Sequence, residues 1–426
     1  MSAAAAVEVD VAIVGGGLVG ASLAAALAPL GLRLALIEGA APDDLRQPSF
    51  DDRTTALGNG TRRVFEALGL WDAIAPDAAA IRRIHVSDAG RFGFARLEAA
   101  ELDLDAFGFV VTNRRLGAAL RARLAAIPGL ELRMPARCTA ARLQADHVEL
   151  VTDPGTAPIR ARLAVAADGA KSLLREAAGL EAATEDYEQV AVVAHAEATR
   201  PADGTAYERF TPQGPFAVLP LAGGAYGVVW TVASAEADKA LALSDADYLA
   251  ALQRAFGWRA GRFIRVGARQ AYPLKLVRAP RVTAPRVALV GNAAQGLHPV
   301  AGQGFNLGLR DAATLAEVMA EGLAAARTRG SGEAAPFDAG SPAPLEAYAA
   351  RRERDREGVT RFTDGLVKLF GDTRPGIPLA RDLGLLLFDL SPTAKQAMSR
   401  LSWGFASRTP RLARGLALGG RAGDGA

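Results

Sequence analysis

The stretch "VDVAIVGGGLVGASLAAALAPLGLRLALIE", residues 9–38, carries two different periodicities on either side of a glycine cluster. Residues 9–14 form a short apolar run rich in β-branched side chains, and a helical pattern with its larger apolar residues on one side follows the glycines. Residues 34–37 form a second apolar run, which ends at Glu38. The stretch therefore predicts a βαβ unit, the building block of an α/β fold.

The same stretch contains a charge-free run, residues 11–32, that is long enough to cross a bilayer. Four glycines fall in its first half, and Pro29 lies near its end. Glu8 and Asp10 precede the run, where a signal peptide would carry basic residues. We therefore expect a buried strand, a turn and a helix here, and not a membrane span.

Three glycines of this turn match the pattern G-x-G-x-x-G between a strand and a helix. Gly15 permits the tight turn, Gly17 lets a diphosphate approach the backbone, and Gly20 lets the helix pack closely on the strand. The N-terminus of the helix offers free N–H groups to a phosphate, and Glu38 is placed to accept hydrogen bonds from ribose hydroxyls. The turn predicts a dinucleotide site for FAD or NAD, with a purely structural glycine turn as the alternative.

Composition limits the class of protein. A chain of 426 residues predicts two connected domains, and a net charge of +3 gives no nucleic-acid footprint. The single cysteine, Cys138, excludes a disulfide framework and a cysteine-based metal site and favours a cytoplasmic protein with an inert thiol. No spacing of His, Asp and Glu suggests another kind of metal site.

The pattern of apolar residues changes twice along the chain. Helical patterns cover residues 53–70 and 114–126, and short alternating runs typical of an antiparallel sheet occupy residues 189–273. An apolar strand, residues 287–290, then returns to the earlier pattern. The expected division is a Rossmann-like nucleotide-binding domain in two parts, 1–180 and 276–328, an antiparallel-sheet substrate domain, 181–275, a linker, 329–344, and a helical C-terminal region, 345–426.

A second glycine turn lies in "LVGNAAQGLHPVAGQGFNLGLRD", residues 289–311, between a strand and a helix. An isoalloxazine ring needs positive potential at its N1–C2=O edge when it is reduced, and backbone N–H groups at a helix N-terminus supply it. The two turns would therefore bind opposite ends of one long cofactor, adenosine diphosphate at the first and flavin at the second. This arrangement favours FAD, because a simple NAD dehydrogenase has no need of the second turn.

These residues carry a resemblance over nearly the whole chain. The sequence resembles the flavin-dependent aromatic hydroxylases and, within them, the ubiquinone-biosynthesis hydroxylases. The motifs that carry it are "GGGLVG", "DDRTTALGNGTRRVFEALGLW", "ADGAKSLLR", "ERFTPQGPFAVLPL", "YPLKL" and "HPVAGQGFNLGLRD". Asn292 and Gln295 stand where most members carry Asp and His, and this departure is similar to the branch that acts on 2-polyprenyl-6-methoxyphenol.

The resemblance implies a set of residues for the cofactor. Gly15, Gly17, Gly20 and Glu38 would hold the ADP half of FAD, and Asp168 with Gly169 belongs to a motif that touches FAD and supports the use of NAD(P)H. The remaining residues implied to contact the cofactor are Arg53, Asn113, Asn292, Pro299, Gly302, Gln303, Gly304 and Asn306.

The resemblance also implies a reaction. NADPH or NADH, bound transiently, would reduce FAD, and dioxygen would form a flavin C4a-hydroperoxide that hydroxylates a polyprenylated phenol in ubiquinone biosynthesis. His298 is the histidine best placed to handle a proton, with a structural role as the alternative. Two other functions stay open, a flavin-dependent prenyl-chain reductase and a non-catalytic prenyl-lipid carrier.

The C-terminal region carries basic residues without an acidic one between Asp389 and Asp424. One interpretation is a solvated helical end. The other is peripheral contact with an anionic membrane at the inner face, which suits a polyprenyl substrate, and other ubiquinone-biosynthesis proteins are further candidate partners. The residues concerned are Lys395, Arg400, Arg408, Arg411, Arg414 and Arg421, with Trp403, Phe405, Leu412, Leu416 and Leu418 among them.

Overall fold

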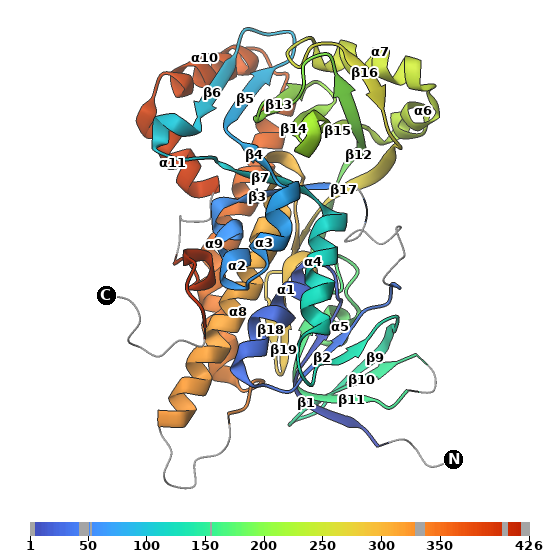
Figure 1. The fold of residues 1–426 in the computed structure, drawn as a ribbon, viewed down its shortest axis with the longest axis vertical. Helices are drawn as coiled ribbons and strands as arrows, with labels where there is room; N and C mark the ends of the chain where they lie inside the picture. The colour runs from blue at the N-terminus through green and yellow to red at the C-terminus, as the bar shows by residue number, and fades with distance from the viewer. Residues whose placement is uncertain are drawn as a thin grey trace.

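The computed structural model describes residues 5–41, 51, 53–153, 156–328, 337–402 and 408–418, with the backbone alone for residues 398–402. Its described part has two sheet-containing ends. An eight-stranded sheet lies at one end, a nine-stranded sheet lies at the other, and helices run between them (Figure 1). The expected fold class, an α/β nucleotide-binding domain with a mostly antiparallel second domain and C-terminal helices, is confirmed.

The eight-stranded sheet is built around the βαβ unit. Strand β1 (Val7–Val14) lies between β2 (Leu34–Ile37) and β11 (Ile159–Ala166), and all three are parallel. Because β19 (Val287–Leu289) pairs in parallel with β11, the chain returns to this sheet after the strands of residues 183–278, as the sequence predicts. The other strands are β8 (Glu131–Arg133), β9 (Cys138–Leu143), β10 (Val148–Thr152) and β18 (Thr283–Ala284).

The nine-stranded sheet is antiparallel except for one pair, β5 with β13. Its central strands are β12 (Ala183–Ala198), β15 (Tyr226–Ala233), β14 (Gly214–Pro220) and β13 (Thr205–Thr211). The outer strands are β20 (Gln295–Gly296), β17 (Gln270–Arg278), β16 (Phe263–Val266), β5 (Arg83–Asp88) and β6 (Phe94–Glu98). A three-stranded sheet of β3 (Thr54–Gly58), β7 (Gly108–Thr112) and β4 (Ala79–Ile81) lies between the two larger sheets (Figure 1).

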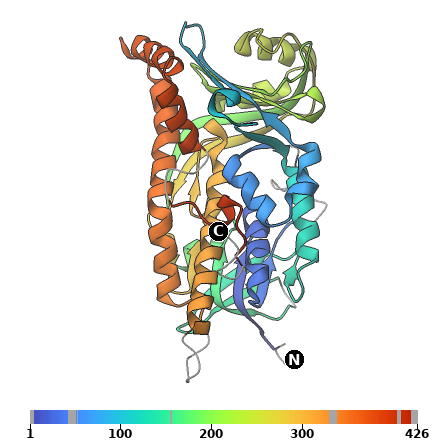
Figure 2. The same cartoon turned by 60° about the vertical axis from the view of Figure 1, so that its left-hand side comes forward.

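The helices join the two ends. Helix α1 (Leu18–Leu27) packs on α8 (Gln303–Thr328), and α8 packs on α9 (Pro342–Gly371), which runs along one side of the molecule to the nine-stranded sheet (Figure 2). The remaining helices are α2 (Asn59–Ala67), α3 (Trp71–Ile74), α4 (Asn113–Ala125), α5 (Leu173–Ala177), α6 (Ala237–Ala242), α7 (Asp245–Phe256), α10 (Ile377–Asp389) and α11 (Pro392–Ser402). Among the helices of the described residues, none is both long and apolar enough to cross a bilayer.

Two local predictions are wrong. Residues 53–70 do not form one helix, because Thr54 and Thr55 pair with β7 as the strand β3 and Gly58 then caps α2 in an extended conformation. β-Branched threonines fit a sheet better than a helix. The sequence also places residues 342–344 in the linker, although they already belong to α9, where proline is tolerated in the first turn. Residues 329–336 lie outside the described residues.

The division at residues 180, 275 and 328 stays a prediction, but the strand pairing adds to it. Strands β5 and β6 fall within the segment 1–180, and the pairing of β5 with β13 places them in the nine-stranded sheet. The substrate-side sheet is therefore assembled from two distant parts of the chain.

Over residues 408–418 the C-terminal tail is partly buried, although Arg408, Arg414 and Leu416 are exposed. Leu412 is buried in the main core, and the backbone N–H of Arg411 donates to Glu317 of α8. Arg408 also forms an ion pair with Glu317, and Lys395 is nearly buried between two carboxylates. The tail residues Trp403, Phe405 and Arg421 lie outside the described residues, as does the side chain of Arg400.

Candidate functional site

The first glycine turn connects the centre of the parallel sheet to α1. Gly15 has a φ of +103°, and a Cβ there would overlap the carbonyl oxygen of Ala167. A Cβ on Gly20 would overlap the carbonyl oxygen of Gly15, so neither position accepts a side chain. Gly17 caps α1 without a side-chain bond, and the first turn of α1 carries no acidic residue. Its N-terminus is thus open to an anion such as a diphosphate.

Glu38 lies beside this turn at the end of β2. Its Oε2 accepts a hydrogen bond from the backbone N–H of Gly16 at 2.7 Å, and its Oε1 accepts one from Ala40 at 2.8 Å. Each carboxylate oxygen can accept a second bond. The nearly buried carboxylate is therefore fixed next to the glycine turn with capacity left for a ribose hydroxyl.

Asp168 and Gly169 follow β11, the strand next to β1. The backbone nitrogen of Asp168 lies 2.7 Å from the position of a Cβ on Gly15, so this motif and the glycine turn touch. Asp168 Oδ2 accepts from the backbone N–H of Leu173 at 2.9 Å, whereas Oδ1 is buried without a hydrogen-bond partner among the described residues. Burial raises the pKa of Asp168 above its usual value. A cofactor hydroxyl is the kind of donor that this oxygen requires.

The second glycine turn combines exposed residues with left-handed backbone. Asn292 and Pro299 are exposed, and Ala301 and Gly302 have φ values of 58° and 60°. Helix α8 begins directly afterwards at Gln303, with no acidic residue in its first turn. A Cβ on Gly304 would meet no protein atom within 4 Å, so the N-terminus of α8 faces open space that could receive a flavin edge.

The two glycine turns lie side by side. A Cβ on Gly291 would lie 3.2 Å from the side chain of Val19 in α1, and a Cβ on Gly308 of α8 would lie 3.0 Å from the Cα of Gly291. Gly291, at the start of the second glycine stretch, therefore lies against both α1 and α8, whereas the binding of one cofactor by both turns stays a prediction.

Protein groups occupy all the hydrogen-bonding positions of the Asn306 side-chain amide. Its Oδ1 accepts hydrogen bonds from the backbone N–H of Gly58 at 2.9 Å and the hydroxyl of Thr61 at 2.6 Å. Its Nδ2 donates to the carbonyl oxygens of Ala56 and Gly302, both at 2.8 Å. An amide has these four bonding positions. The sequence analysis assigned Asn306 to the cofactor. In this structure its amide ties the second glycine turn at Val300–Gly302, called the flavin-side turn from here on, to β3 and α2.

Arg53 and Asn113 meet at a polar cluster between the two domains. Arg53 Nε donates to Asp51 Oδ2 at 2.7 Å, and its guanidinium lies 4.2 Å from the ring centre of Tyr272 on β17. The hydroxyl of Tyr272 donates to the same carboxylate at 3.0 Å. Asn113 Oδ1 accepts from the hydroxyl of Thr55 at 2.7 Å. The cluster links the start of β3 to the substrate sheet.

His298, the predicted proton-handling residue, is buried. Its Nδ1 accepts from the backbone N–H of Val300 at 3.2 Å, which leaves the proton on Nε2, 3.4 Å from Gln189 Oε1. Burial lowers the pKa of His298 to about 4. The imidazole is therefore neutral at pH 7 with both nitrogens engaged, and this geometry favours its structural alternative.

The sequence analysis missed Glu208 on β13. Phe210 on the same face of β13 packs with Val300 of the flavin-side turn, and the carboxyl group of the half-buried Glu208 lies near the backbone N–H of Ala301. Burial raises the pKa of Glu208 to about 7, although the nearby N–H of Ala301 opposes the shift. Glu208 starts the motif "ERFT", but only the approach of β13 to the turn at residues 300–302 reveals its position.

A buried ion cluster, also missed, supports the second turn from behind. Asp311 Oδ2 accepts from the backbone N–H of Gly291 at 3.1 Å and from Gln295 Nε2 at 2.6 Å. Asp311 Oδ1 accepts from Arg352 Nε at 2.7 Å, and Arg352 also binds Asp355. Gln295 thus serves as a neutral donor within this cluster.

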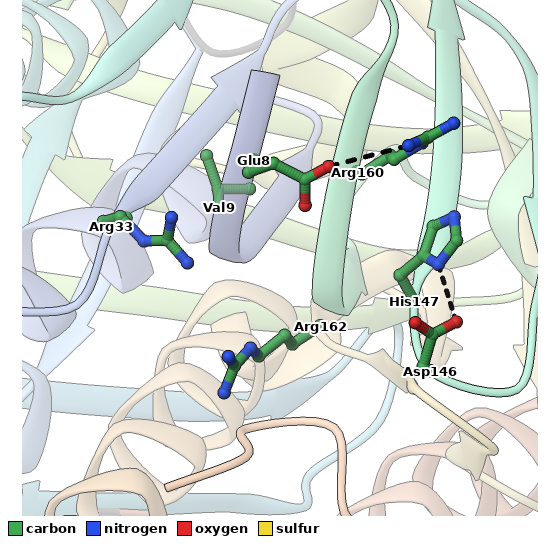
Figure 3. A pocket seen from close by; sticks show the side chains of 7 residues that line it. All are labelled: Glu8, Val9, Arg33, Asp146, His147, Arg160 and Arg162. Carbon is green, nitrogen blue, oxygen red and sulfur yellow. Dashed lines mark hydrogen bonds and ion pairs between the residues drawn. The ribbon is translucent and has the colours of Figure 1, made fainter. Parts of the chain in front are cut away.

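A pocket elsewhere in the molecule is unrelated to these turns (Figure 3). It is lined by Glu8 and Val9, at the opposite end of β1 from Gly15, and by charged residues including Arg33 and Arg160. Within the described residues, no group of three or more His, Cys, Asp and Glu side chains could hold a metal ion.

Comparison with known proteins agrees with this geometry. Residues 8–339 match the family model described as FAD binding domain. The ubiquinone hydroxylase UbiL of Rhodospirillum rubrum is 40% identical, over 96% of this chain and 93% of that protein. The 3-demethoxyubiquinol 3-hydroxylase of Escherichia coli is 32% identical, over 93% of this chain and 98% of that protein.

Solved structures share the fold. The p-nitrophenol 4-monooxygenase PnpA of Pseudomonas putida superposes with a TM-score of 0.76 at 20% identity, covering 94% of this chain and 99% of that one. PqsL of P. aeruginosa in complex with 2-aminobenzoylacetate gives a TM-score of 0.72 at 21% identity, covering 89% and 99%.

The fold and the paired glycine turns define an FAD-dependent aromatic hydroxylase, a flavoprotein monooxygenase. Its cofactor is FAD, and NAD(P)H is the usual reductant in such enzymes. The chain belongs to the family of FAD-dependent hydroxylases that includes the ubiquinone hydroxylases.

Proposed function

We propose that this protein hydroxylates a polyprenylated phenol in ubiquinone biosynthesis, with 2-polyprenyl-6-methoxyphenol as the substrate and NAD(P)H and dioxygen as co-substrates. The observation that carries the proposal is the full-length similarity to two ubiquinone-pathway hydroxylases. The residue pair Asn292 and Gln295 supports the choice of phenol by its resemblance to that branch. A cytoplasmic location belongs to the same proposal.

FAD, when bound, supplies the activation of dioxygen for transfer to an electron-rich ring. The protein residues contribute binding and a proton acceptor. The first glycine turn and Glu38 would hold the ADP half, and the N-terminus of α8 would stabilise negative charge at the flavin edge. We assign to Glu208 the removal of the phenol proton, because its carboxyl group lies against the flavin-side turn and a base with a pKa near the working pH is effective.

The function is tested with the purified FAD-loaded protein, NADPH and a polyprenylated methoxyphenol. The expected result is oxygen uptake coupled to formation of a product with one additional hydroxyl on the phenol ring. NAD(P)H consumption and saturation of the prenyl chain without oxygen uptake would instead identify a reductase. A protein that neither retains added FAD nor turns over would be a carrier. Deletion of the gene should cause the same phenol to accumulate in lipid extracts.

The role of Glu208 is tested by Glu208→Gln, which keeps the shape of the side chain and removes the base. We expect kcat/KM at pH 7 to fall about 100-fold or more and to recover as the pH approaches that of phenol ionisation, about 10. Glu101→Gln, at an exposed carboxylate, is the control. Parallel pH profiles for Glu208→Gln and the unmodified enzyme would rule out this role.

A further inference from the structure

Helix α10 exposes an apolar stripe. Leu379, Leu383 and Leu387 follow one another at intervals of four residues and are 55%, 49% and 68% exposed. Leu390, just past the helix, is 78% exposed. The other exposed residues of the helix are Ala380 and Gly384, so no charge interrupts this surface. Residues four apart lie on one face of a helix.

The charged residues of α10 face inward. Arg381 Nε donates to the buried Asp88 of β5 at 2.9 Å, and Asp389 accepts from the backbone N–H of Arg96 on β6 at 2.6 Å. Asp382 is buried against Gly93. A surface helix normally buries its apolar face and exposes its polar one. The polar face of helix α10 binds β5 and β6 of the nine-stranded sheet, so its apolar face is exposed and available to a binding partner.

The stripe has a positive rim. Phe92, on the turn between β5 and β6, is exposed beside Gly93 and extends the apolar surface. Arg91, Arg96 and Arg374 are exposed around it, whereas the carboxylates that pair with them lie further inside. The α10 face, defined as Phe92, Leu379, Leu383, Leu387 and Leu390, is therefore bordered by exposed arginines whose carboxylate partners are more buried. It lies at the end of the molecule that carries the nine-stranded sheet (Figure 1).

The α10 face connects to the flavin-side turn through apolar packing. Leu385 of α10 contacts a cluster that contains Phe210, Phe370 and Val300. The rings of Phe210 and Phe370 stack with their centres 3.5 Å apart. Val300 belongs to the flavin-side turn. The α10 face is therefore linked to the flavin-side turn by packed apolar side chains.

We propose that the α10 face docks on an anionic lipid bilayer, with the leucines in the acyl boundary and the arginines at the phosphate level. The apolar stripe and basic rim match the two parts of such an interface. The proposal rests on the proposed function, because a polyprenylated phenol resides in the bilayer and would enter beside α10. It places membrane contact on the substrate side of the molecule, away from the tail residues 408–418, which pack on α8.

The test measures vesicle binding by the full-length, FAD-loaded protein. Vesicles of phosphatidylcholine with phosphatidylglycerol are compared with vesicles of phosphatidylcholine alone, for the unmodified protein and for Leu383→Ser/Leu387→Ser. Because burying two leucines is worth about 100-fold in binding, the variant should lose about that factor on anionic vesicles. Leu132→Ser, at an exposed leucine on β8, is the matched control and should bind normally.

Three outcomes overturn the proposal. Equal binding by Leu383→Ser/Leu387→Ser and the unmodified protein would exclude the α10 face. Conversion of a dimer to a monomer by the same variant, without a change in vesicle binding, would assign the face to a second copy of the chain. Failure of the unmodified protein to bind anionic vesicles would exclude docking altogether.

Activity separates this proposal from the proposed function. Turnover of a water-soluble short-chain phenol should be the same in the unmodified protein and in Leu383→Ser/Leu387→Ser, because these side chains lie on the surface. Vesicle binding without hydroxylation would support the docking surface and refute the proposed function. Hydroxylation without vesicle binding would support the proposed function and refute the docking surface.

Discussion

Replacing Arg352 by methionine should lower the free energy of unfolding, because it disrupts the buried ion cluster behind the flavin-side turn. Arg352 is buried and donates to Asp311 at 2.7 Å and to Asp355 at 2.6 Å. Asp355 keeps a second cation, since Arg310 Nε donates to it at 2.7 Å. Asp311 keeps only the neutral donors Gly291 and Gln295 among the described residues. The variant thus changes a balanced buried cluster of two cations and two carboxylates into one with an excess negative charge.

The structure sets the size of the effect. Breaking a buried ion pair by removal of one partner costs about 3–5 kcal/mol, because the remaining charge stays desolvated. Whole domains are stable by only about 5–15 kcal/mol, so the loss is a large fraction of the total. FAD retention should also weaken, because Asp311 holds the backbone N–H of Gly291 at the second turn.

Arg361→Met is the matched control. Arg361 is an exposed residue of the same helix, α9, and pairs at the surface with Glu357. Exposed ion pairs contribute about 0–1 kcal/mol. The assay is urea unfolding followed by circular dichroism, with and without FAD, with free energies from linear extrapolation. A loss for Arg352→Met no larger than that for Arg361→Met would refute the assignment of a supporting role to the buried cluster.

Two further predictions concern the histidine and the flavin edge. Because burial lowers the pKa of His298 to about 4, from about 6.5 in the unfolded chain, its contribution of about 3 kcal/mol is present above pH 6.5 and is lost as the pH falls towards 4. The difference in unfolding free energy between the unmodified protein and His298→Gln, measured from pH 7.5 to 4.5, should shrink accordingly, and a constant difference would contradict a buried neutral imidazole. Gly304→Ala should leave the stability of the FAD-free protein unchanged or slightly raised, because a Cβ there meets no protein atom, yet weaken FAD binding measured by fluorescence quenching. Gly358→Ala, at an exposed position on α9 with similar free space, should affect neither, and unchanged FAD affinity in Gly304→Ala would place the flavin edge elsewhere.

The parts of the fold that follow from local patterns are predictable from the sequence. The βαβ unit was predictable, because strand, glycine turn and helix are contiguous and each has its own periodicity. The return of β19 to the first sheet was predictable as well, because a fully apolar strand is typical of a buried parallel position. The strand β3 was not predictable, because its threonines adopt an extended conformation by pairing with β7, more than 50 residues later in the chain.

The candidate site was predictable where backbone freedom decides it. Glycines at Gly15 and Gly20 are required by contacts within a short segment, so their motif identifies them. Glu208 was not predictable, since its environment arises when β13 approaches Ala301 from a distant part of the chain. The structural role of Asn306 was hidden for the same reason, because its partners Ala56, Gly58 and Thr61 lie about 250 residues earlier.

Segment β3–α2 explains why the two domains act on one cofactor. On one side, Asn306 binds the backbone of Ala56 and Gly58 and so fixes the flavin-side turn. On the other, Thr54 packs against Gly227 of the substrate sheet, where a Cβ would lie 2.9 Å from the threonine hydroxyl. Hydrogen bonds hold a geometry more narrowly than apolar packing does, because they depend on both distance and angle. The position of the substrate sheet over the flavin-side turn is therefore set through this segment, so a change at Thr54 should alter the alignment of substrate and flavin more than the affinity for either.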